Sequence, residues 1–132
     1  MQLVVDCSAL VFSTVRTDSA AVGLRRRIVA ADCHAPHLID AEVGSALRRM
    51  TLRGELSAEH ARVVLRTAGS LVEHRYPHRR GLADVAWSLR DRVGFCDGLY
   101  VALAAALGVP LLTLDSRLAG AGSLPCRVEV VG

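Results

Sequence analysis

The chain has 132 residues, a length that predicts a single domain with its own hydrophobic core. Hydrophobic residues make up 52% of it and charged residues 22%, and no apolar run is long enough to span a bilayer, so no membrane association is expected. The net charge is +3, and all 16 basic residues are arginine. The absence of lysine excludes mechanisms that need a catalytic or phosphate-binding lysine, such as that of P-loop enzymes.

The N-terminus and the cysteines indicate a cytoplasmic protein. The first residues, MQLVVDCSAL, contain no basic segment and reach an acid at Asp6, unlike a secretory signal. The four cysteines lie far apart without a CxxC pair and are expected to be packing residues. Cys33, His34 and His37 could bind zinc, but their spacing is loose and no second ligand pair is present, so surface histidines are the preferred interpretation.

In chain order, the first part of the sequence predicts a strand and two helices. Residues 3–5 are apolar and β-prone and are followed by an acid, Asp6, as expected for a buried strand. Residues 9–12 can begin a helix, and the spacing of apolar residues predicts a second helix over about 18–31. Three consecutive arginines, 25–27, lie largely on its outer side, where they form either a solvated face or a patch for nucleic acid.

The middle of the sequence predicts a short strand and a helical hairpin. Residues 33–35 precede a proline and fit the strand. The next helix covers about 37–53 and ends at Gly54, and a further helix starts at an N-cap residue, Ser57. Apolar stripes on these two helices either pack inside the molecule or contact a partner. Glu42 lies at the edge of the first stripe, where it is either solvated or bound to a partner group.

The segment after the hairpin predicts a connection and another helix. Residues 72–76 fit a short strand or a plain connector, and residues 78–93 have the periodicity of a helix. Four large side chains are expected on the buried side of that helix: Leu82, Val85, Trp87 and Leu89.

Within residues 94–118, one acid lies at the start of a predicted helix and another follows the end of a predicted strand. Asp97 opens a helix of small and apolar residues, and Gly108 followed by Pro110 ends it. Residues 111–114 then form an apolar run that fits a central strand, and Asp115 follows it directly. A Gly-rich turn leads to a last, edge strand over 127–131.

The predicted order of elements is β-α-α-β-α-α-β-α-α-β-β. Short apolar strands separated by helices indicate an α/β protein. The expected fold is one three-layer α/β/α domain over residues 1–132, with a short-stranded, mainly parallel sheet. In such a sheet the strand C-termini and the helix N-termini meet at one edge. Asp6, Glu42, Asp97 and Asp115 can all reach that edge.

Four carboxylates at one edge need compensation for their charge. Two carboxylates about 5 Å apart at an effective dielectric of about 20 repel by roughly 3 kcal/mol, so a group of four would stay partly protonated without a divalent cation. An all-carboxylate site suits Mg²⁺ or Mn²⁺ rather than Zn²⁺. The sequence therefore predicts a magnesium-type site.

Several stretches of the sequence resemble the PIN-domain family and, within it, the VapC-type ribonuclease toxins of toxin–antitoxin pairs. The matching pieces are VVDCSALV, PHLIDAEVGSALRR, RGELS between two helices, and FCDGLYVALAAALGVPLLTLD. The last is the most specific, because it combines an acid, the aromatic Tyr100, an Ala-rich helix, Gly-x-Pro and Thr-x-Asp. The resemblance extends through nearly the whole chain and implies a PIN-like fold.

The resemblance also implies a reaction: Mg²⁺-dependent hydrolysis of RNA phosphodiester bonds by an endoribonuclease, with Mn²⁺ as the alternative metal. The implied catalytic and metal-binding acids are Asp6, Glu42, Asp97 and Asp115. Asp6, Asp97 and Glu42 would hold the principal ion, and Asp115 would complete the site or orient water. The hydroxyls of Ser8 and Thr113 would support the ligands, and Arg117 is the nearest candidate for a phosphate contact.

The implied partners are an RNA substrate, with tRNA and rRNA as candidates, a VapB-like antitoxin that inhibits the enzyme, and a second copy of the chain in a homodimer. Two positions depart from the family pattern: Ser45 stands where Asn is frequent, and Gly98 where Ala is common. The aromatic content of 4% argues against a base-stacking platform, so RNA recognition should depend on charge and shape.

Other interpretations of the acids are weaker. A receiver domain needs a lysine beside its acids, and a HAD-type phosphatase needs a second acid two residues after the first, where this chain has Ser8. The alternative from a different class is a catalytically weak PIN-like module that binds RNA or a protein. A measurement of catalytic turnover would distinguish this module from the nuclease.

Overall fold

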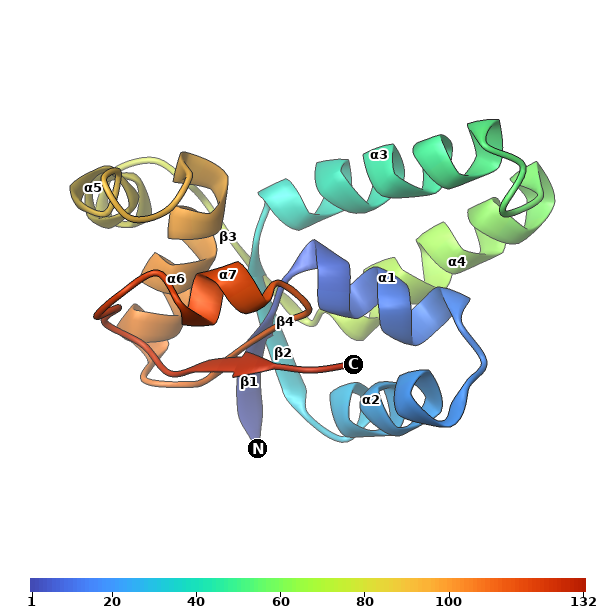
Figure 1. Ribbon diagram of the computed structural model, residues 1–132, viewed down its shortest axis with the longest axis horizontal. Helices are drawn as coiled ribbons and strands as arrows, with labels where there is room; N and C mark the ends of the chain where they lie inside the picture. Colours follow the sequence, from blue (N-terminus) through green and yellow to red (C-terminus); the bar gives the residue numbers. More distant parts are fainter.

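The computed structural model describes residues 1–132 and contains one five-stranded sheet with the strand order β3-β2-β1-β4-β5 (Figure 1). All four pairs of neighbouring strands are parallel. The strands are β1 (Gln2–Val5), β2 (Asp32–Pro36), β3 (His74–Tyr76), β4 (Leu111–Thr113) and β5 (Val128–Val130). The predicted α/β class with a parallel sheet is confirmed, and β5 lies at the sheet edge as expected.

Seven helices surround the sheet. They are α1 (Cys7–Val15), α2 (Ser19–Val29), α3 (Leu38–Leu52), α4 (Ala58–Leu71), α5 (Gly81–Ser88), α6 (Phe95–Leu107) and α7 (Ser116–Ala119). Helices α1 to α4 lie on one side of the sheet, and α6 lies on the other with α5 packed against it (Figure 1). None of the helices has the length and hydropathy needed to cross a lipid bilayer.

The central strands are buried on both faces, which is why they are continuous apolar runs. Leu3, Val4 and Val5 of β1 are inaccessible to solvent. In the β1–β4 pair, Val5 lies opposite Leu112, and the N–H of Asp6 donates to the carbonyl of Leu112 at 3.1 Å. This register brings the C-terminal ends of the two strands to the same height.

The helical hairpin α3–α4 is attached to the sheet at one end by an arginine. The guanidinium of Arg75 in β3 donates to both carboxylate oxygens of Asp40 in α3, at 2.6 and 2.9 Å. It also donates to the carbonyls of Gly69 and Val72 at the end of α4. One side chain therefore joins β3, the start of α3 and the end of α4.

The helix predicted over 78–93 is shorter in the structure, and the prediction for its buried side is partly wrong. Helix α5 covers α6 rather than the sheet, so Ala86 is buried while Trp87 is 62% exposed and Val85 is 38% exposed. His78 lies before the helix, where its Nε2 accepts the N–H of Leu38 at 2.9 Å and caps α3.

The Gly-rich turn after β4 contains a helix that the sequence does not predict. Helix α7 is a single turn with one buried residue, Leu118, so it has no apolar periodicity to detect. The structure also decides between the short strand and the connector expected over 72–76, because residues 74–76 form the strand β3.

The arginines at 25–27 do not form a free basic patch. Arg25 donates to the carbonyl of Ser13 at 3.0 Å, and Arg27 forms a two-pronged ion pair with Glu129 of β5 at 2.6 and 2.8 Å. Two of the three arginines therefore hold α2 to its neighbours.

Gly98 allows α5 and α6 to approach closely. A Cβ atom at Gly98 would lie 3.1 Å from both Cα and Cβ of Ala86 and 3.3 Å from its carbonyl oxygen. These distances are shorter than ordinary van der Waals contact, so α5 would have to shift by a few tenths of an ångström to accommodate a larger residue. The departure from the family pattern at this position thus has a packing reason.

We expect Gly98→Ala to lower the free energy of unfolding by about 1–3 kcal/mol, because the new methyl group overpacks the α5–α6 contact. Urea unfolding of the purified variant measures the effect. The matched control is Gly23→Ala in α2, where a Cβ meets no atom within 4 Å and a gain of about 0.5–1 kcal/mol is expected. Combining Gly98→Ala with Ala86→Gly should cost less than the sum of the two single changes; full additivity would contradict the contact.

Candidate active site

The four acids singled out by the sequence line one cleft of about 320 Å³ at the C-terminal edge of the sheet. They come from four different elements: Asp6 follows β1, Glu42 lies on α3, Asp97 lies on α6 and Asp115 follows β4. In Figure 1 these element ends meet near the centre of the molecule, between α1, α3, α6 and α7. The structure therefore brings together all four residues.

Asp6 is the most enclosed of the acids, with 8% of its surface exposed. Its Oδ1 accepts the hydroxyl of Ser8 at 2.6 Å and the N–H of Ala9 at 3.0 Å, which caps α1, and its Oδ2 accepts the hydroxyl of Thr113 at 2.5 Å. Burial raises the pKa of Asp6, and these hydrogen bonds counteract the rise. The carboxylate is consequently fixed in one orientation.

Ser8 and Thr113 extend this arrangement to the end of β4. The oxygen of Ser8 accepts the N–H of Leu114 at 3.0 Å, and the oxygen of Thr113 accepts the N–H of Asp115 at 3.0 Å. Each hydroxyl thus donates to Asp6 and accepts from the backbone that leads to Asp115. The two hydroxyls support Asp6 and position the segment that carries the fourth acid.

Glu42 has a partner, which resolves the choice left open by the sequence. The hydroxyl of Tyr100, a side chain 2% exposed, donates to Oε1 of Glu42 at 2.6 Å. Partial burial raises the pKa of Glu42, and the nearby charges of Asp6 and Asp97 add to the rise. Tyr100 lies one turn after Asp97 on α6, so its place in the sequence motif is explained by this contact.

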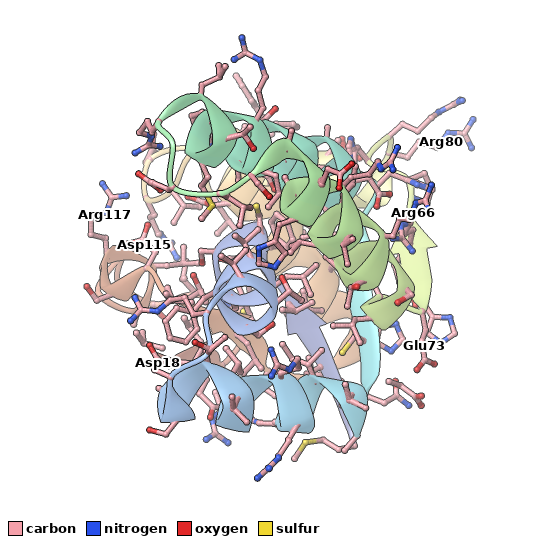
Figure 2. The ribbon with its side chains drawn as sticks, turned by 90° about the vertical axis from the view of Figure 1, so that its right-hand side faces the viewer. Asp18, Arg66, Glu73, Arg80, Asp115 and Arg117 are labelled. Carbon is pink, nitrogen blue, oxygen red and sulfur yellow. The ribbon has the colours of Figure 1, made fainter.

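Asp97 and Asp115 have opposite electrostatic environments. Asp97 lies in the first turn of α6, and its pKa is raised by partial burial and by the charges of Asp6 and Asp115. Asp115 accepts the guanidinium of Arg117 at 3.0 Å on each of its two oxygens and also caps α7, so its pKa is lowered. Figure 2 shows Asp115 and Arg117 side by side at the edge of the molecule, far from Arg66 and Arg80. Arg117 is therefore paired with Asp115, and its role as a phosphate contact stays a prediction.

A family model matches most of the chain: residues 3–123 match the model described as the PIN domain. The chain belongs to the PIN-domain family. This PIN domain is 48% identical over 130 residues to Ribonuclease VapC1 of Mycobacterium tuberculosis, with 98% of each chain covered. It is 39% identical over 129 residues to VapC ribonuclease Mb0985 of Mycobacterium bovis, again with 98% of each chain covered.

Solved structures share the fold. The VapBC2 complex from Rickettsia felis, bound to a DNA fragment from its promoter, superposes on this PIN domain with a TM-score of 0.74 at 14% identity and covers 100% of both chains. Mycobacterium tuberculosis VapC20, described as a sarcin–ricin loop cleaving toxin, gives a TM-score of 0.65 at 16% identity and covers 95% of this chain and 98% of that one. At these identities the likeness shows the α/β/α fold alone.

The four acids of the PIN domain have the donor atoms that a divalent cation prefers, although their side chains do not form a close cluster. All the donors are carboxylate oxygens, and burial, together with the charges of the neighbouring acids, raises the pKa of three of the four carboxylates. No group of three or more His, Cys, Asp or Glu side chains is close enough to hold a metal ion jointly. The assignment of these residues as metal ligands stays a prediction.

The other candidate groups do not form a site. The thiol of Cys7 lies in the cleft, but burial and the charges of Glu42 and Asp6 raise its pKa to about 12, so it is protonated and a poor nucleophile. His34 is buried rather than on the surface as predicted, because its ring bonds Tyr76 at 2.8 Å and Gln2 at 3.0 Å. These contacts use both ring nitrogens and leave none for zinc.

Sequence reasoning missed one residue of the cleft, Arg49. It lies on α3 two turns after Glu42 and lines the same cleft. The spacing of seven residues puts the two side chains on one face of the helix. The seven-residue spacing between Glu42 and Arg49 is the signal in the sequence that identifies Arg49 as a residue of the cleft.

We expect Asp97→Asn to raise the free energy of unfolding in EDTA at pH 7 and low ionic strength, by roughly 1 kcal/mol or less because the group is only partly buried. The raised pKa of Asp97 means that the folded state loses stability as the pH rises from the ordinary pKa of an aspartate, 3.8, through the raised pKa. The gain of the variant should therefore be small near pH 4 and grow towards pH 7 in a series of thermal melts.

The matched control for this prediction is Asp115→Asn. Its carboxylate has a lowered pKa and an arginine partner, so its removal should not stabilise the protein. A wild-type protein as stable as Asp97→Asn across the pH series would show that the acids do not repel one another in the cleft.

Proposed function

We propose that this PIN domain is a metal-dependent endoribonuclease, the VapC-like toxin of a toxin–antitoxin pair, which hydrolyses RNA phosphodiester bonds in the acid cleft. The observation that carries the proposal is the meeting of Asp6, Glu42, Asp97 and Asp115 in one cleft at the end of a parallel sheet. The names of the relatives, Ribonuclease VapC1 among them, support the reaction class.

The proposed cofactor is Mg²⁺, with Mn²⁺ as the alternative. Asp6, Asp97 and Glu42 would hold the principal ion, and Asp115 would complete the site or orient water. Mg²⁺ keeps several of its waters and needs only one or two carboxylates directly, which suits acids that are near one another without forming a tight set. When bound, such an ion polarises a phosphoryl oxygen and lowers the pKa of the attacking water.

The residues of the chain prepare this chemistry before any substrate arrives. Ser8 and Thr113 fix the carboxylate of Asp6, and Tyr100 orients that of Glu42. Asp115 stays ionised because Arg117 lowers its pKa, so it can accept a hydrogen bond from the attacking water. The fixed donors mean that little reorganisation is needed when charge develops in the transition state.

We further propose a VapB-like antitoxin that inhibits the enzyme and a homodimer of the PIN domain. The structural neighbours from Rickettsia felis and Salmonella typhimurium are VapBC complexes, which supports a partner of this kind. The competing function is a catalytically weak module that binds RNA or protein in the same cleft.

The decisive experiment is cleavage of total RNA by the purified, antitoxin-free protein. We expect discrete fragments with Mg²⁺ or Mn²⁺ and none with EDTA. Asp97→Asn should lower the rate at least about 100-fold, since several kcal/mol of stabilisation by the metal would be lost while the fold is kept. Ser8→Ala and Thr113→Val should lower it by about 10–100-fold, because they only support Asp6.

The matched control is Asp32→Asn, the same chemical change at an exposed acid. Asp32 is the first residue of β2 and lies at the N-terminal edge of the sheet, away from the cleft. It should cleave at the wild-type rate. Cleavage by Asp97→Asn at that rate would remove the assignment of the cleft, and folded wild-type protein inactive with every metal would favour the binding module.

A further inference from the structure

Arg49 is the one basic residue that lines the acid cleft, and its guanidinium has no partner in the protein. The ion pairs of the structure use Arg16, Arg27, Arg53, Arg75 and Arg117, and none involves Arg49. Its side chain also makes no hydrogen bond, although it stands on the same face of α3 as Glu42. An unpaired cation beside four carboxylates is available for an anionic ligand.

A second pocket opens from the acid cleft beside Arg49. Its volume is about 310 Å³, and it shares Cys7, Glu42 and Arg49 with the cleft. The remaining wall comes from Leu38, Ala41 and Ser45 of α3. The pocket therefore has an apolar wall near the start of α3 and a hydroxyl and a guanidinium, one helical turn apart, towards its other end.

The opposite side of the cleft is different. A cavity of about 250 Å³ shares Asp97 and Asp115 with the cleft and is also lined by Arg92 and Arg117. Arg117 pairs with Asp115, whereas Arg92 donates to the carbonyl of Ser123 and has no acidic partner. Both cavities share residues with the acid cleft, and of the three arginines Arg49 alone has neither an ion-pair partner nor a side-chain hydrogen bond.

A negatively charged RNA strand needs such a cation to approach the acids. Four carboxylates repel phosphate, and a guanidinium binds a phosphate group through two parallel N–H donors. The apolar wall of the side pocket offers contact to a base, which requires no aromatic side chain. The charge of Arg49 and the apolar wall thus match the two halves of a nucleotide.

We propose that the side pocket formed by Leu38, Ala41, Ser45 and Arg49 binds the nucleotide next to the scissile phosphate. Arg49 and Ser45 hold the backbone phosphate of that nucleotide, and Leu38 and Ala41 contact its base. The RNA then runs from α3, across the acids, to the start of α6 and α7. This assignment rests on the proposed ribonuclease function, and Arg49 acts in it as a positioning residue.

Binding of RNA tests the pocket separately from cleavage. The probe is a fluorescent single-stranded RNA taken from a fragment junction, or a mixed-sequence RNA if no fragments form, titrated with Asp97→Asn protein in Mg²⁺ at several salt concentrations. Adding Arg49→Ala should weaken binding about tenfold at low salt and reduce the slope of log K against log salt by about 0.7, the loss of one phosphate contact. Arg49→Lys should restore part of the affinity, because it keeps the charge without the fork.

The matched control is Arg48→Ala, the preceding residue of α3. Arg48 also lacks an ion-pair partner but lines the separate groove between α3 and α4. It should change neither affinity nor slope. If Arg48→Ala weakens RNA binding as much as Arg49→Ala, a general surface charge explains the result and the pocket is overturned.

Cleavage kinetics with otherwise wild-type protein complete the test. Arg49→Ala should raise KM more than it lowers kcat, since the residue positions the strand without touching the reacting atoms. Active wild-type enzyme with an unchanged Arg49→Ala variant would overturn the pocket and leave the ribonuclease function intact. Inactive wild-type protein whose RNA binding still depends on Arg49 would support the pocket and overturn the ribonuclease function.

Discussion

The carboxylate of Asp6 and the two hydroxyls that bind it connect the fold to the site. Ser8 and Thr113 each donate to Asp6 and accept a backbone N–H just beyond β4. Hydrogen bonds to an ionised acceptor are about twice as strong as neutral ones, and a buried carboxylate without them would be costly. The carboxylate of Asp6 therefore holds the ends of β1 and β4 in place, and with them Asp115. The same carboxylate faces the cleft.

The cleft concentrates negative charge that the protein itself does not neutralise. Burial and mutual repulsion raise the pKa values of Asp6, Glu42 and Asp97, and only Asp115 has a cation beside it. Such an arrangement lowers the stability of the folded state, and groups of perturbed acids in a cleft are typical of functional sites. The position of Arg49 in the same cleft adds one positive charge that is not used in folding.

Much of the fold and the positions of the acids could be predicted from the sequence, because apolar runs and the acids that follow them depend on local order. Asp6 and Asp115 follow buried strands for a reason visible in the sequence: an acid contributes nothing to packing there. The sequence did not predict the features that depend on tertiary contacts. Trp87 is exposed because α5 covers another helix and not the sheet, and the bond between Tyr100 and Glu42 joins residues 58 positions apart.

The attachment of the α3–α4 hairpin at a single end gives the molecule a mechanical asymmetry. Arg75 joins the start of α3 and the end of α4 to β3, while the connection between the helices projects away from the sheet (Figure 1). The hairpin is thus fixed at one end, and that end carries Glu42, two residues after Asp40 of the Arg75–Asp40 ion pair. A load applied at the free end would displace the connection between the helices much more than it displaces Glu42, because deflection grows with distance from the fixed end.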